Sequence, residues 1–104
     1  MTDRDPDTEA IFRSIRAQAQ ETNRIRVETL DELTADVGDD GLSARIRHRA
    51  KDLAHQIAGS AGTFGYLRAS DLAREIETIL VGDVDAGALA DLRKRIEELR
   101  GALG

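Results

Sequence analysis

The stretch from Leu42 to Phe64 reads LSARIRHRAKDLAHQIAGSAGTF, and its apolar residues recur every three or four positions. This is the period of an amphipathic α-helix, in which residues three and four apart lie on the same face. The spacing therefore predicts one helix over 42–64. Its core-facing stripe is expected to consist of Leu42, Ile46, Ala50, Leu53, Ile57, Ala61 and Phe64.

The segment before this helix shows helical spacing from Asp7 or Thr8, just after Pro6, to Val37. A helix of thirty residues would span about 45 Å, which is longer than any other helix expected here. We therefore expect its first turn to overhang the rest of the fold, or the helix to bend near Thr22 and Asn23. The sequence GDDG at 38–41 predicts the turn that follows it.

Two shorter helices are expected after residue 64. The third helix is predicted to begin at Ala69 or Ser70, with Ser70 as its N-cap and Asp71 in its first turn. Its apolar face is expected to contain Leu72, Ala73, Ile76, Ile79 and Leu80. The fourth helix is predicted over 85–103. Its seam is formed by Leu89, Leu92, Ile96, Leu99 and Leu103.

Four amphipathic helices joined by short connections predict an all-α fold, an antiparallel four-helix bundle. The 104 residues fit one domain over 7–104, preceded by a disordered tail at 1–6. No strand-like alternation, internal repeat or second-domain boundary is visible. Only three residues are aromatic, so the core is expected to be aliphatic.

The composition argues against several classes of partner and chemistry. The net charge of −5 disfavours nucleic acid and anionic membranes, because both require a cationic surface. The absence of cysteine excludes disulfides and thiol chemistry. Neither a signal peptide nor an apolar run of transmembrane length is visible. These features predict a soluble, monomeric, cytoplasmic domain.

The orientation of His55 on the helix over 42–64 is the main functional signal. With Leu53 at zero, the apolar stripe centres near about 25° and His55 lies near about 200°, so its ring is expected to face outward. The same face carries Lys51, Ala58, Gly59 and Gly62. Glycine inside a helix costs about 1 kcal/mol relative to alanine. One interpretation is that this bare strip lets a large partner approach His55. The alternative is a solvated histidine, with glycines that serve helix packing.

No other residue completes a familiar catalytic or metal site with His55. Ser60 lies at i+5, on the other side of the helix, and cannot act as its nucleophile. His48 lies two turns away, about 10 Å along the axis, whereas a zinc site needs three or four ligands. The sequence therefore predicts no metal site, and His48 is expected to be a solvated surface residue.

The segment AHQIAGSAGTFG at 54–65 resembles the phosphoacceptor segment of histidine-containing phosphotransfer (HPt) domains of two-component phosphorelays. The resemblance is carried by His55, Ile57, Gly59, the small residues at 60–62, and Gly65. The segment LAREIE at 72–77 is also similar to the next helix of that family. Over the first forty residues the similarity is limited to helical character.

The resemblance implies that His55 is a phosphoacceptor, that Gly59 leaves room for a partner and that Gly65 ends the helix. The lysine that the family often carries three residues after the histidine is replaced by Ala58, and Lys51 is the candidate substitute. The implied partner is the receiver domain of a response regulator or hybrid histidine kinase. Mg²⁺ is expected on that receiver, with no cofactor on this chain.

The implied function is that of a phosphocarrier without enzymatic turnover of its own, in which His55 exchanges a phosphoryl group with a receiver aspartate. The sequence leaves open a helical adaptor or anti-activator that binds a signalling partner without phosphorylation. A metal-binding bundle is a third alternative, disfavoured by the missing ligands.

Overall fold

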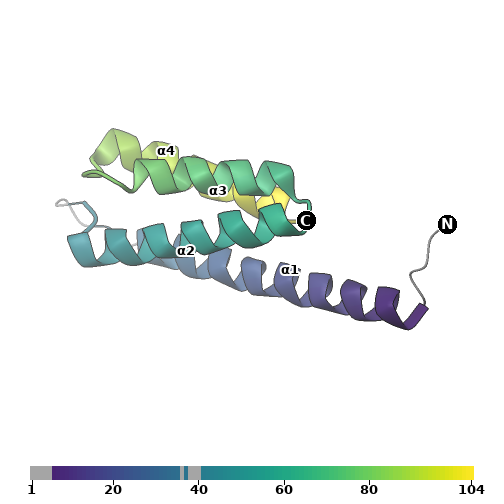
Figure 1. The fold of residues 1–104 in the computed structure, drawn as a ribbon. Helices are drawn as coiled ribbons and strands as arrows, with labels where there is room; N and C mark the ends of the chain where they lie inside the picture. The colour runs from purple at the N-terminus through teal and green to yellow at the C-terminus, as the bar shows by residue number, and fades with distance from the viewer. Residues whose placement is uncertain (1–5, 36, 38–40) are drawn as a thin grey trace.

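The computed structural model describes residues 6–35, 37 and 41–104, which form four helices and no strand. These are α1 (Pro6–Ala35), α2 (Ala44–Thr63), α3 (Leu67–Ile79) and α4 (Ala86–Ala102). Each helix packs against two others, in the cyclic order α1, α2, α3, α4, and neighbours along the chain run antiparallel (Figure 1). The predicted all-α four-helix bundle is confirmed.

Helix α1 is one uninterrupted helix that is much longer than the bundle it joins. The molecule measures 59 × 20 × 19 Å, and the N-terminal turns of α1 project beyond the connection between α2 and α3 (Figure 1). The expected overhang is therefore observed. Helix α1 begins at Pro6, a residue that favours the first helical position because it lacks an N–H. Most of the predicted tail and of the predicted 38–41 turn lies outside the described residues.

The core lies along the central axis of the bundle and is aliphatic. Helix α3 buries Leu72, Ala73, Ile76 and its C-cap Leu80, and α4 buries Leu92, Ile96, Leu99 and its C-cap Leu103. These residues match the stripes that the sequence predicts for the third and fourth helices. From α1, Val27 and Leu30 complete the core.

Helix α2 is turned relative to its predicted orientation. Its buried residues are Ala50, Ala54, Ile57, Ala58 and Ala61. Leu53 is only half-buried and lines a surface groove with Arg49 and Gln56. The buried face is displaced by about 60° from the predicted stripe. The prediction that Leu53 faces the core is wrong, because α2 packs through its alanines, whose small side chains let neighbouring helices approach closely.

The start of α3 also differs from the prediction. The helix begins at Leu67 with Tyr66 as its N-cap, so Ser70 is not the N-cap. Ser70 is instead buried inside the helix, where its hydroxyl donates a hydrogen bond of 2.8 Å to the carbonyl oxygen of Ala58. The prediction of side-chain capping fails here because the chain re-enters a helix directly after the turn at Gly65.

Ion pairs on the surface fasten α1 to α4. Arg93 lies 2.6 Å from Asp31, and Arg100 donates two hydrogen bonds to Glu28, at 2.8 and 3.0 Å. The hydrogen bond from Arg100 lowers the pKa of the Glu28 carboxyl group below its ordinary value, and the same bond raises the pKa of Arg100. Because these groups are open to solvent, the pairs contribute orientation more than stability.

The orientation of α2 can be tested by two substitutions on the same helix. Ile57→Ala removes a fully buried side chain and should lower the free energy of unfolding by about 2–5 kcal/mol. Leu53→Ala should cost less than half as much, because that side chain is only half-buried and lies outside the core cluster. Urea denaturation of both variants measures the difference. Equal losses would mean that Leu53 belongs to the core.

Candidate functional site

His55 lies in the middle of α2 with its side chain 75% exposed. Its Nδ1 is 3.0 Å from Oε2 of Glu77 on α3, a carboxylate whose side chain is 29% exposed. An ionised carboxylate can only accept a hydrogen bond, so Nδ1 carries the proton and donates it to Glu77. In the tautomer that makes this bond the lone pair is on Nε2, and no described residue bonds that nitrogen. The site therefore has one ring nitrogen, Nδ1, that is hydrogen-bonded to Glu77, and a second, Nε2, that is available as a nucleophile.

Glu77 is the residue of this site that sequence reasoning missed. It lies 22 positions after His55, on a different helix. It is the last residue of the segment LAREIE, but helical periodicity places it only on the edge of an apolar face. Its role depends on the register between α2 and α3, which periodicity does not supply.

Two hydrogen bonds fix that register. Ser70 bonds the carbonyl of Ala58, and Glu77 bonds the ring of His55. On each helix the two contact points are three or seven residues apart, which keeps them on one face. These two contacts align the antiparallel helices α2 and α3 at the histidine and one turn after it.

Gly65 ends α2 in a conformation that other residues adopt at a cost. Its φ is +86°, in the left-handed region. The Gly65 N–H donates to the carbonyl of Gly62 at 3.2 Å, and the Tyr66 N–H donates to that of Ala61 at 2.8 Å. This is the Schellman motif, which satisfies carbonyls at the end of a helix. It turns the chain sharply into α3 and brings Glu77 back alongside α2.

The expected strip of small exposed residues around His55 is narrower than the sequence suggests. Gly59 is exposed, and a Cβ added there would meet nothing within 4 Å. Ala58, in contrast, is only 4% exposed, so its expected place on the open face is wrong. Gly62 is half-buried, and a Cβ there would lie 3.2 Å from the Ser70 hydroxyl. Both residues face α3 because α2 is turned toward it.

The other predicted neighbours of His55 lie on the outer surface. Lys51, one turn before His55, is half-buried and forms no ion pair with any described residue. His48 is 71% exposed, and its Nε2 is 3.8 Å from Asp52, an exposed pair that contributes little to stability. Within residues 6–35, 37 and 41–104, no group of three histidine, aspartate or glutamate side chains could hold a metal ion. Among the same residues, no helix is sufficiently long and apolar to cross a membrane.

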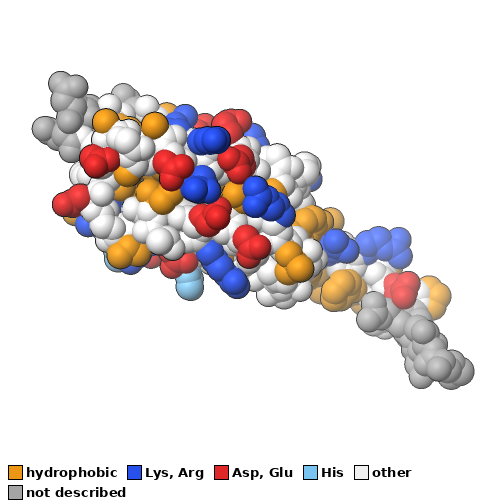
Figure 2. All heavy atoms as spheres, turned by 90° about the horizontal axis from the view of Figure 1, so that it is seen from above, with side chains coloured by type: hydrophobic (Ala, Val, Ile, Leu, Met, Phe, Trp, Pro, Cys, Tyr) orange, Lys and Arg blue, Asp and Glu red, His pale blue; other side chains and the backbone are white. Residues whose placement is uncertain are grey.

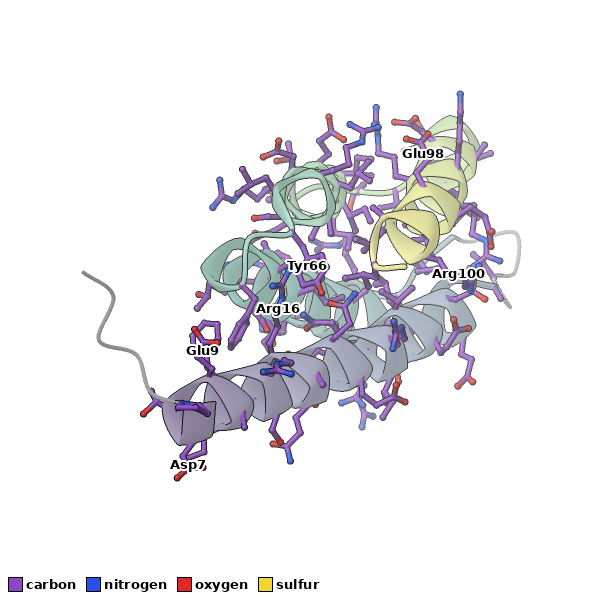
Figure 3. The ribbon with its side chains drawn as sticks, turned by 90° about the vertical axis from the view of Figure 1, so that its right-hand side faces the viewer. Asp7, Glu9, Arg16, Tyr66, Glu98 and Arg100 are labelled. Carbon is purple, nitrogen blue, oxygen red and sulfur yellow. The ribbon has the colours of Figure 1, made fainter. Side chains whose placement is uncertain are left out.

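Helix α1 adds exposed apolar surface beyond the end of α2. Ile11 and Ile15 are 61% and 48% exposed, and Figure 2 shows apolar side chains on the narrow projecting part of the molecule. Ile25 is also exposed, but it lies alongside the bundle, because Asn23 two residues earlier bonds Ser60 of α2. The projection is anchored where Phe12 meets Phe64, with ring centroids 6.2 Å apart. Arg16 lies 5.0 Å over the Tyr66 ring, between α1 and the α2–α3 connection (Figure 3).

Comparison with known proteins gives one match. The family model described as "Hpt domain" matches residues 14–104. Comparisons with curated proteins and with solved structures gave no significant match. The matched span contains α2, α3 and α4 entirely and most of α1, and it includes both His55 and Glu77. Because that span covers most of the chain, the protein belongs to the Hpt domain family, whose role is phosphotransfer in two-component signalling.

Proposed function

We propose that this domain is a phosphocarrier in which His55 accepts a phosphoryl group from a receiver-domain aspartate and passes it to another. The observation that carries the proposal is the placement of the imidazole. Its ring is exposed in the middle of a rigid helix, its Nδ1 is held by Glu77, and its Nε2 is free. A neutral imidazole is a competent nucleophile near neutral pH.

The transfer step follows from this arrangement. The Nε2 lone pair attacks the phosphorus of an aspartyl phosphate, so that an N–P bond forms while the P–O bond to the aspartate breaks. The aspartate leaves as a carboxylate. No proton has to move, because Nδ1 keeps its hydrogen throughout. The ring becomes positively charged, and the Glu77 carboxylate 3.0 Å from Nδ1 stabilises that charge.

The remaining requirements of the reaction are assigned to the partner. Phosphoryl transfer depends mainly on positioning and on neutralisation of the phosphoryl oxygens. We infer that the receiver supplies both, with Mg²⁺ in its acidic pocket, and that this chain needs no cofactor. A domain that holds only the nucleophile has no turnover of its own.

The proposed docking surface is the outer face of α2 around His55 and Gly59. Gly59 follows His55 by one turn and leaves open space beside the ring. The acidic net charge disfavours nucleic acid and anionic lipid as partners. The receiver of a response regulator or of a hybrid kinase is therefore the proposed partner. We propose that the domain acts as a cytoplasmic monomer.

The central test is His55→Gln. This variant should lose phosphoryl acceptance completely, because the nucleophile is removed, while its stability changes by no more than about 0.5 kcal/mol. The measurement is incubation with a phosphorylated receiver, followed by detection of acid-labile, base-stable phosphate. His48→Gln is the matched control and should accept phosphate normally. Phosphorylation of the His55 variant would contradict the proposal, and binding of the receiver without any phosphorylation would favour an adaptor.

Gly59→Gln tests the docking surface. The substitution should leave stability unchanged or raise it by up to about 1 kcal/mol, because glutamine favours the helix and nothing obstructs its Cβ. Transfer from a phosphorylated receiver should fall by more than about tenfold, since in-line attack tolerates little displacement. Gly101→Gln on α4 provides the control, because that glycine is equally open and lies on another helix. Normal transfer by the Gly59 variant would show that the receiver docks elsewhere.

Glu77→Ala tests whether the Glu77 carboxylate keeps the His55 ring protonated at Nδ1. Without the carboxylate, the neutral imidazole should divide its proton between both nitrogens, and the transfer rate should fall by about tenfold, the effect of losing one charge-assisted hydrogen bond. Nitrogen NMR of the histidine ring reports the tautomer directly. A ring that remains protonated at Nδ1 in this variant would refute the assigned role of Glu77.

A further inference from the structure

A phosphoryl group on His55 would create a local excess of negative charge. Such a group carries between one and two negative charges at neutral pH. It would stand on a ring whose other nitrogen already bonds the carboxylate of Glu77, in a chain of net charge −5. A cation near Nε2 would offset this charge, and the bundle can supply one from either helix.

Arg74 lies on the same ridge of α3 as the two residues that contact α2. Ser70 bonds the Ala58 carbonyl, and Glu77 bonds His55. Arg74 follows Ser70 by four positions and precedes Glu77 by three, a spacing that aligns the three side chains on one face. Ser70 is buried against α2 whereas Arg74 is exposed, so Arg74 lies on the solvent side of this face, one turn before the glutamate that bonds His55.

Among the residues that the structure describes, the guanidinium of Arg74 has no hydrogen-bond or ion-pair partner, unlike those of nearby arginines. Arg68 pairs with Glu98 on α4, and Arg95 of α4 pairs with Glu75. Arg47 donates to the carbonyls of Leu80 and Val81 at the end of α3. Within the described part of the chain, no carboxylate pairs with Arg74 or with Lys51, which precedes His55 by one turn on α2. The acidic residues that flank Arg74 on the same face of α3 are Asp71, three positions before it, and Glu77, three positions after it, and the Glu77 carboxylate already bonds His55.

We propose that Arg74 contacts the oxygens of the phosphoryl group carried by His55, and that Lys51 contacts them from the α2 side. This inference rests on the proposed function of His55. The planar guanidinium matches the oxygen geometry of a phosphoryl group and forms paired, charge-assisted hydrogen bonds with it. The two cations shift the exchange with the receiver toward phosphohistidine, and they act on the phosphorylated state only.

The test is the equilibrium of phosphoryl exchange between this domain and a receiver. Arg74→Gln should shift the ratio of phosphohistidine to aspartyl phosphate toward the receiver by about three- to tenfold, the loss of one charge-assisted contact. Arg74→Lys should restore part of the ratio. Arg68→Gln is the matched control, an exposed arginine of the same helix that pairs with α4, and it should leave the ratio unchanged.

Phosphorus NMR of the isolated phosphoprotein gives a readout that does not depend on docking. Loss of the cation should raise the pKa of the phosphoryl group in Arg74→Gln relative to the unsubstituted domain, because the more highly charged form is less stabilised. An unchanged ratio and an unchanged phosphoryl titration would overturn the inference, as would an equal effect of Arg68→Gln. If the unsubstituted domain accepts no phosphate, the proposed function itself fails and this inference fails with it.

Discussion

The close approach of α2 and α3 is the constraint on which the site depends. The buried face of α2 is made almost entirely of alanines, and Gly62 continues it to the end of the helix. A single Cβ at Gly62 would come within 3.2 Å of the Ser70 hydroxyl. Only at this short separation can Ser70 bond the backbone of α2, and a glutamate on α3 reach the ring of His55. The small side chains of α2 therefore support the site indirectly, because the close packing they allow brings Glu77 within reach of His55.

Buried polar contacts supply the register that an aliphatic core leaves open. On α1, Asn23 is buried and donates to the Ser60 hydroxyl of α2 at 3.1 Å, while Arg26 donates to its amide oxygen at 3.0 Å. Leucine and isoleucine side chains tolerate sliding between helices, whereas a buried amide tolerates no unpaired alternative. Asn23 therefore fixes α1 against α2 in the way that Ser70 fixes α3.

The sequence predicts those parts of this fold that large apolar residues mark. Helices α3 and α4 bury the leucines and isoleucines that their periodicity selects. On α2 the periodicity correctly selects Ala50, Ile57 and Ala61, but it places Leu53 in the core and misses Ala54 and Ala58, because it favours large apolar residues over small ones. A residue such as Ser70 looks like an N-cap in sequence, because its type suits that position. Its actual bond to Ala58 requires knowledge of a neighbouring helix.

In the candidate site, too, the sequence predicts some features correctly and misses others. The exposure of His55 follows from its place on α2 even with the stripe misplaced by about 60°, because about 115° still separate it from the buried face. Ala58 lies nearer the boundary, so the same error moves it from surface to core. The contact between Glu77 and His55 depends on the register between α2 and α3, which the sequence pattern does not predict.

Helix α2 has two faces with different roles, one that packs against α3 and one that faces a partner. The face toward α3 needs small side chains so that backbones approach, and the outer face needs small side chains so that a partner can approach. A glycine on the outer face lowers the stability of the helix, so packing elsewhere must offset that loss. The alanine face and the Schellman turn of α2 provide the offsetting contacts. The nucleophile can then stand on a rigid helix, with one ring nitrogen fixed by a neighbouring helix, while the catalytic charge comes from outside. A loop could offer equal exposure, but it would not hold Nε2 in one direction, and in-line transfer depends on that direction.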